Sequence, residues 1–87
     1  MNNYFATFAN GQTITIVTKR TCAVAYKIDT PNGVVTGFSL NAKNALAAVG
    51  NLVCSVPKHD VSKGAKEMRE ENAKFLSACK IEIVAVS

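Results

Sequence analysis

The periodicity of the apolar residues changes near residue 40 of this chain, and this change constrains the fold more than any other feature. Over residues 4–38, apolar and β-branched side chains alternate with polar ones, the pattern of strands with one buried face. Over residues 42–79, apolar side chains recur instead at helical spacing. Residues 80–86 are rich in Ile and Val and return to strand character. The sequence therefore predicts strands, then helices, then a closing strand.

Two turn signals divide the first half. Asn10-Gly11 is typical of a two-residue type I′ hairpin turn, which places Phe5 opposite Ile16. The segment Thr-Pro-Asn-Gly at residues 30–33 predicts a three-residue hairpin loop with glycine in the left-handed position. The predicted strands are residues 4–9, 12–18, 22–28 and 34–38.

The connection between the second and third strands decides which side chains form the core. A two-residue turn there would put Ile14 and Ile16 on the face of Ala23 and Ala25. A connection of odd length gathers the larger apolar residues on one face, and we adopt that register. The predicted core face is then Phe5, Ile14, Ile16, Val24, Tyr26, Ile28 and Phe38.

The helical half predicts two helices. The first covers residues 42–56 and ends at Pro57, and the second begins near residues 60–62 and ends near Cys79. Asn72 is the one polar residue in the apolar stripe of the second helix. The order ββββααβ predicts an α+β fold, a two-layer sandwich made of a four-stranded antiparallel β-meander, two helices and a closing strand. At 87 residues, we expect residues 1–87 to form a single domain.

The net charge of +4 lies in the first two thirds of the chain. Residues 1–58 hold five cations and one anion, whereas residues 59–87 hold five of each. Lys19, Arg20 and Lys43 are the candidates for contact with nucleic-acid phosphates. The strand–hairpin–strand that leads into residues 37–48, together with these residues, resembles the end of a double-stranded-RNA-binding domain, in which a sheet leads into a helix opened by phosphate-binding lysines. This chain has only Lys43 there and lacks that family's first helix, so nucleic-acid binding stays the alternative function.

Catalytic and metal-binding patterns are missing from the sequence. Cys22, Cys54 and Cys79 are far apart and form no CxxC pair, which argues against a zinc site or a disulfide framework and favours buried thiols in a reducing cytoplasm. His59-Asp60 could move protons, but an aspartate there is more simply a helix cap. No apolar run reaches the ~18 residues that a membrane span needs. We therefore expect a cytoplasmic, non-enzymatic protein without cofactor or metal.

Further apolar side chains fall on the sheet face opposite the predicted core. A half-apolar face with a basic rim suits a protein–protein contact or a homodimer. The predicted partner-binding residues are Tyr4, Phe8, Val17, Lys19, Arg20, Lys27 and Val35.

In size, strand-then-helix order and lack of a motif, the whole chain resembles the small accessory proteins of bacteriophages and mobile elements, including anti-CRISPR inhibitors of host defence. The resemblance implies stoichiometric binding to a protein complex of a bacterial host. Many such inhibitors imitate DNA with dense acidic surfaces, and the net charge of +4 departs from that pattern. Contact with an acidic protein surface, or with bound nucleic acid, fits the charge better.

Overall fold

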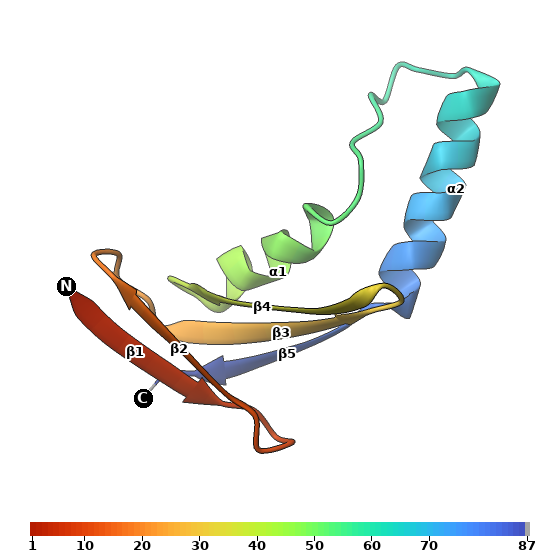
Figure 1. Cartoon of the computed structure of the whole chain (residues 1–87). Coiled ribbons are helices and arrows are strands. Elements are labelled where there is room, and N and C mark those ends of the chain that lie inside the picture. The colour runs from red at the N-terminus through yellow and green to blue at the C-terminus, as the bar shows by residue number, and fades with distance from the viewer. Residues whose placement is uncertain (87) are drawn as a thin grey trace.

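The computed structural model describes residues 1–86, which form five strands and two helices in the order ββββααβ (Figure 1). The predicted α+β class and element order are therefore confirmed. The strands are β1 (Asn2–Thr7), β2 (Thr13–Thr18), β3 (Val24–Thr30), β4 (Gly33–Ser39) and β5 (Lys80–Ala85), and the helices are α1 (Ala42–Gly50) and α2 (Lys63–Ala78).

The strands form two antiparallel sheets instead of the predicted four-stranded meander. β1 pairs only with β2, whereas β3 lies between β4 and β5 in a three-stranded sheet. β5 takes the place beside β3 that was predicted for β2. Its register offers a reason, because Lys27 lies opposite Glu82 and Asp29 opposite Lys80. Opposite charges across a strand pair are stabilising, and β2 carries no charged residue that could offer the same match.

The three-stranded sheet is covered on both faces, so the layout also differs from a sandwich with helices on one face. The β1–β2 hairpin crosses one face and α1 lies on the other (Figure 1). Ala25 and Lys27 of the central strand β3 are buried on the hairpin side. Ile28, on the opposite side of β3, is the largest fully buried side chain among the described residues. The hairpin-side core consists of Ala6, Phe8 and Ala25, with Ile14, Phe38, Val84 and Val86 packed against them.

The turn of the β1–β2 hairpin is one residue longer than predicted. The N–H of Gly11 donates to the carbonyl of Phe8 at 2.9 Å, and the N–H of Phe8 donates to the carbonyl of Gln12 at 2.8 Å. Residues 9–11 therefore form a three-residue loop, with Gly11 in the left-handed region at a φ of 88°. Phe5 consequently lies opposite Thr15, and the predicted pairing of Phe5 with Ile16 is wrong.

The predicted core face is divided among three places. Ile14 packs against the hairpin-side core, whereas Phe5 points away from the sheet and is 49% exposed. Phe38 lies opposite Ala25 and packs on the hairpin side. This last difference arises because Thr30 pairs with Gly33, so the β3–β4 connection has two residues instead of three. The residues Val24, Tyr26 and Ile28 alternate with Ala25 and Lys27 and lie on the α1 side of the sheet.

α1 is shorter than predicted. Asn41 caps it by accepting from the N–H of Asn44 at 2.8 Å, and the helix ends at Gly50 instead of near residue 56. Glycine is among the least favourable helix residues, and the β-branched, Ser and Pro residues of the segment 53–57 do not support further turns. Residues 51–62 form an irregular connection to α2.

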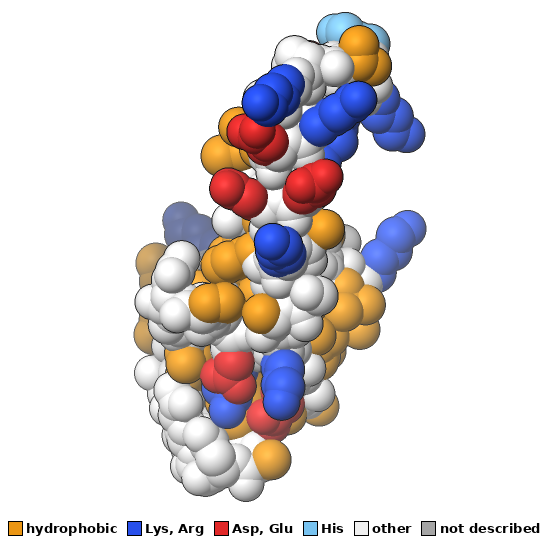
Figure 2. Space-filling model, turned by 90° about the vertical axis from the view of Figure 1, so that its right-hand side faces the viewer, with side chains coloured by type: hydrophobic (Ala, Val, Ile, Leu, Met, Phe, Trp, Pro, Cys, Tyr) orange, Lys and Arg blue, Asp and Glu red, His pale blue; other side chains and the backbone are white. Residues whose placement is uncertain are grey.

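The connection and α2 together form an arm that extends from the two sheets (Figure 1). Ser62 caps α2 by accepting from the N–H of Ala65 at 3.2 Å. Asn72 donates to the carbonyl of Cys54 at 2.7 Å, which explains the polar residue in the apolar stripe. The guanidinium of Arg69 donates to the carbonyl of Pro57. Cationic and anionic side chains are intermixed on the solvent face of α2 (Figure 2).

Neither helix within residues 1–86 has the length and apolar character needed to cross a membrane.

Candidate protein-binding surface

The outer face of the β1–β2 hairpin is not covered by the three-stranded sheet. We call it the hairpin face; it consists of Asn3, Phe5, Thr7, Thr13, Thr15 and Val17. Thr7 and Thr13 are opposite each other, and their hydroxyl oxygens are 3.1 Å apart. Phe5 is 49% exposed and Val17 62% exposed, and they are diagonal neighbours at about 7 Å across the strand pair. The hairpin face is therefore uncharged, with two exposed apolar side chains near one end.

The inner face of the same hairpin fixes it to the sheet. Phe8 is only 2% exposed, and Ala6 and Ala25 are completely buried beside it. Alanine side chains allow the hairpin backbone to approach β3 closely, and the Phe8 ring adds a large apolar surface to this contact. The hairpin is thus held from one side while its other side stays exposed.

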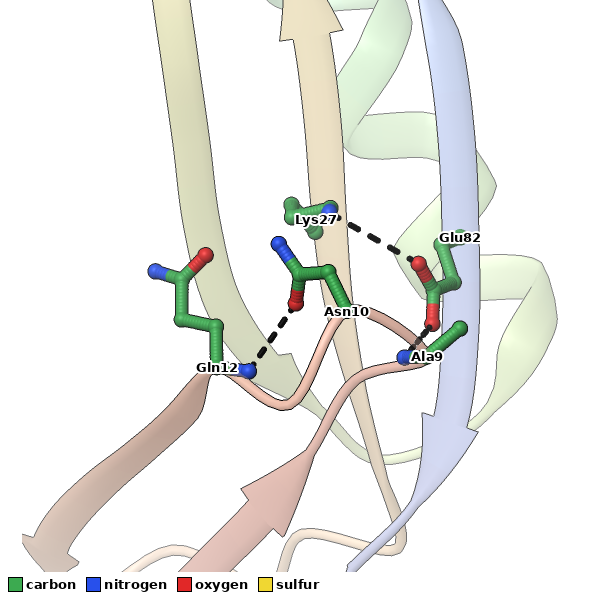
Figure 3. Close-up of polar contacts among 5 residues, drawn as sticks. All are labelled: Ala9, Asn10, Gln12, Lys27 and Glu82. Carbon is green, nitrogen blue, oxygen red and sulfur yellow. Dashed lines mark hydrogen bonds and ion pairs between the residues drawn. The ribbon is translucent and has the colours of Figure 1, made fainter.

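A polar contact at the hairpin turn adds to this attachment (Figure 3). The N–H of Ala9 donates to Oε2 of Glu82 at 2.7 Å, and Oε1 of the same carboxylate is 3.7 Å from Nζ of Lys27. Nζ of Lys27 also lies 5.7 Å from the centroid of the Phe8 ring, a cation–π distance. Asn10 stabilises the turn itself by accepting from the N–H of Gln12 at 2.9 Å. One carboxylate of β5 therefore connects the turn to the central strand.

Three of the predicted partner-binding residues do not lie on an exposed face. Phe8 is buried, Tyr4 is half-buried on the inner side of the hairpin, and Lys27 is only 9% exposed. The cause is the longer turn, which reverses the faces of β1, together with the pairing of Lys27 with Glu82. The same difference in turn length explains why the sequence did not predict that Phe5 is exposed. The residues Ala9-Asn10-Gly11 also fit a three-residue hairpin loop, in which glycine is common at the third position. Such a loop places Phe5 on the outer face of β1.

The other predicted residues are exposed but do not form one patch. Val17 belongs to the hairpin face, and Lys19 and Arg20 adjoin this face because they come directly after β2. Val35 is exposed on β4 in the other sheet. Lys43 is exposed in the first turn of α1.

A cavity of about 420 Å³ lies between the segment after β2 and the start of α1. Its lining residues are Arg20, Thr21, Cys22, Phe38, Ser39, Leu40 and Asn44. Arg20 therefore lies near the first turn of α1, where Lys43 precedes Asn44. Of the three free thiols, Cys22 is buried as predicted, whereas Cys54 is exposed and Cys79 is intermediate.

Among residues 1–86, no three His, Cys, Asp or Glu side chains lie together in a way that could hold a metal ion. The sequence matches no protein-family model and no curated protein, and the fold matches no solved structure.

Proposed function

We propose that this chain is a non-enzymatic binding protein that attaches through its hairpin face to a protein complex of a bacterial host. The biological role that suits it is that of a phage or mobile-element inhibitor of host defence, such as a CRISPR–Cas complex, acting in the cytoplasm. The observation that carries the proposal is the pair Phe5 and Val17, exposed on the outer side of a hairpin whose inner side is anchored by Phe8.

The chemistry of the hairpin face supports a protein partner. Its four polar members are Asn and Thr, which adapt their hydrogen bonds without the desolvation cost of a buried charge. An aromatic side chain beside a branched aliphatic one gives an anchor of the kind that dominates binding energies. Lys19 and Arg20 at the end of β2 add a basic rim, so we expect acidic side chains around the matching site on the partner.

We expect the substitution Phe5→Asp to abolish capture of the partner. The measurement is a pull-down from bacterial lysate with tagged chain, in which the captured protein is quantified against the bait. The matched control is Leu46→Asp, which places the same charge on α1 at a leucine that is 53% exposed. The control should keep a stoichiometric partner.

Plating of a CRISPR-targeted phage tests the role itself. Cells that express the wild-type chain should support plaques, and cells that express Phe5→Asp should not. If no partner is captured stoichiometrically, or if both variants lose it equally, the hairpin face is not the binding site.

Nucleic-acid binding is the second candidate, favoured by the proximity of Arg20 to the first turn of α1, which carries Lys43. Together with Lys19, these side chains would contact phosphates. If they do, the affinity for RNA or DNA should fall steeply with salt, because each neutralised phosphate releases a counterion. For three contacts, we expect a loss of roughly 15- to 50-fold between about 50 and 200 mM salt. A fluorescence titration that finds no binding at the lower salt removes this candidate.

A further inference from the structure

The chain exposes more surface than a monomer of its size normally does. Its accessible surface is 5940 Å², whereas a folded monomer of this mass ordinarily exposes about 5,000 Å². Its radius of gyration is 15.5 Å, compared with about 12 Å for a compact domain of this length. The excess of about 1,000 Å² is close to what each partner buries in a stable protein–protein interface, ~800 Å².

The arm accounts for the extended shape, since α2 projects away from the two sheets (Figure 1). An isolated helix of this length is marginal in water and normally depends on packing of its apolar side. In α2 the connection covers that side only in part, through the bonds that Asn72 and Arg69 make to it. Met68, in the apolar stripe, remains 42% exposed.

One row of residues along α2 is exposed over most of its length and can pack against the same row of a second copy. Gly64, Met68, Glu71 and Phe75 follow the four-three-four spacing that aligns side chains on a helix surface. Gly64, Met68 and Glu71 are exposed, and Phe75 is half-buried. If a second α2 lies antiparallel, centred between residues 69 and 70, Phe75 faces Gly64 of the second copy. A side chain added at Gly64 would meet no other atom of its own chain, so this position has room for the ring.

The charges of α2 suit the same arrangement. On the two sides of the pairing centre, residues 63–69 hold Lys63, Lys66 and Arg69 against Glu67, and residues 70–76 hold two glutamates against Lys74. Antiparallel pairing puts the positive half of each helix beside the negative half of the other. Glu67 then lies within about two helix residues, roughly 3 Å along the axis, of Lys74 of the second copy. A parallel arrangement would instead place like halves together.

We infer that the chain forms a two-fold symmetric homodimer through antiparallel packing of α2 against α2 of a second copy. This interface leaves the hairpin face of each copy free, so the dimer would present two binding faces. The inference does not depend on the proposed function, because it can be tested with purified protein alone.

Sedimentation of the purified chain over a range of concentrations tests the dimer. We expect a mass of twice 9.3 kDa, with half of the chains dimeric at about 10 µM. Met68→Glu should weaken dimerisation by at least about 30-fold, because it replaces an apolar side chain by a second carboxylate that faces Glu71 of the other copy. Ala73→Glu adds the same charge on the other side of α2 and should leave the dimer unchanged. A single-chain mass up to roughly 200 µM would overturn the inference.

A charge exchange tests the antiparallel direction and does not depend on a buried substitution. Glu67→Lys and Lys74→Glu should each weaken the dimer about tenfold, since each replaces two attractive contacts by two repulsive ones. The double variant should regain most of the wild-type affinity. Within one copy the two residues are seven positions apart, about 10 Å along the helix, so restoration would report contact between copies. If the double variant loses as much dimer affinity as the two single variants together, the antiparallel packing is wrong.

Discussion

Phe8→Ala is expected to lower the free energy of unfolding by about 3 kcal/mol, the usual cost of removing a buried phenylalanine ring. Phe8 is 2% exposed and fills the space between the hairpin and the three-stranded sheet. For a chain of this length, the loss corresponds to a melting temperature lower by about 15 °C. Urea unfolding followed by circular dichroism, at one fixed protein concentration, measures it.

Phe5→Ala is the matched control, because it removes the same ring three positions earlier from the outer face of β1. Phe5 is half exposed, so we expect a stability loss below about 1 kcal/mol. For partner binding, the proposed function predicts the opposite order of effects at these two positions. Phe5→Ala should weaken binding of the partner. Phe8→Leu, a milder core variant that keeps the fold, should leave this binding unchanged. Equal losses of stability from the two alanine variants would mean that β1 does not have the observed register.

This pair of phenylalanines also illustrates what the sequence could and could not predict. The alternation of apolar residues predicts that residues 4–18 form a hairpin, and the structure agrees. It does not decide between a two- and a three-residue loop around Asn10-Gly11, because both turns accept glycine there. One residue of difference reverses every side chain of β1, so the predicted core gained Phe5 and lost Phe8.

Local sequence patterns could not predict which strands pair, and the reason is different. Whether β2 or β5 lies beside β3 depends on contacts between residues more than fifty positions apart, such as Lys27 with Glu82. A lone lysine in a strand gives no sign of its partner, and an exposed rim is the usual place for it. The helix positions, by contrast, follow from local signals. Ser62 caps α2 as its sequence suggests, and only the end of α1 at Gly50 differs.

The ion pair between Glu82 and Lys27 should also contribute strongly to the free energy of unfolding. We expect Glu82→Gln to lower the free energy of unfolding by about 2 kcal/mol, because it leaves the ammonium of Lys27 without its counter-charge. The side chain of Lys27 is 11% exposed, whereas that of Glu82 is 30% exposed, so the loss should be smaller than the ~3–5 kcal/mol seen for fully buried pairs. The amide oxygen of glutamine can still accept from the N–H of Ala9, so this variant isolates the charge.

The double variant with Lys27→Met and Glu82→Gln should regain most of the free energy of unfolding that Glu82→Gln alone loses. Methionine keeps an apolar stem beside the Phe8 ring and removes the charge that would otherwise stay unpaired in the interior. Lys27→Met alone should cost less than Glu82→Gln, because the more exposed carboxylate that it leaves behind can turn to water. Urea unfolding of the three variants gives the coupling energy directly. If the double variant is less stable than Glu82→Gln, an unpaired cation is not the source of the loss, and the hydrogen bond from Ala9 must carry the attachment of the hairpin turn.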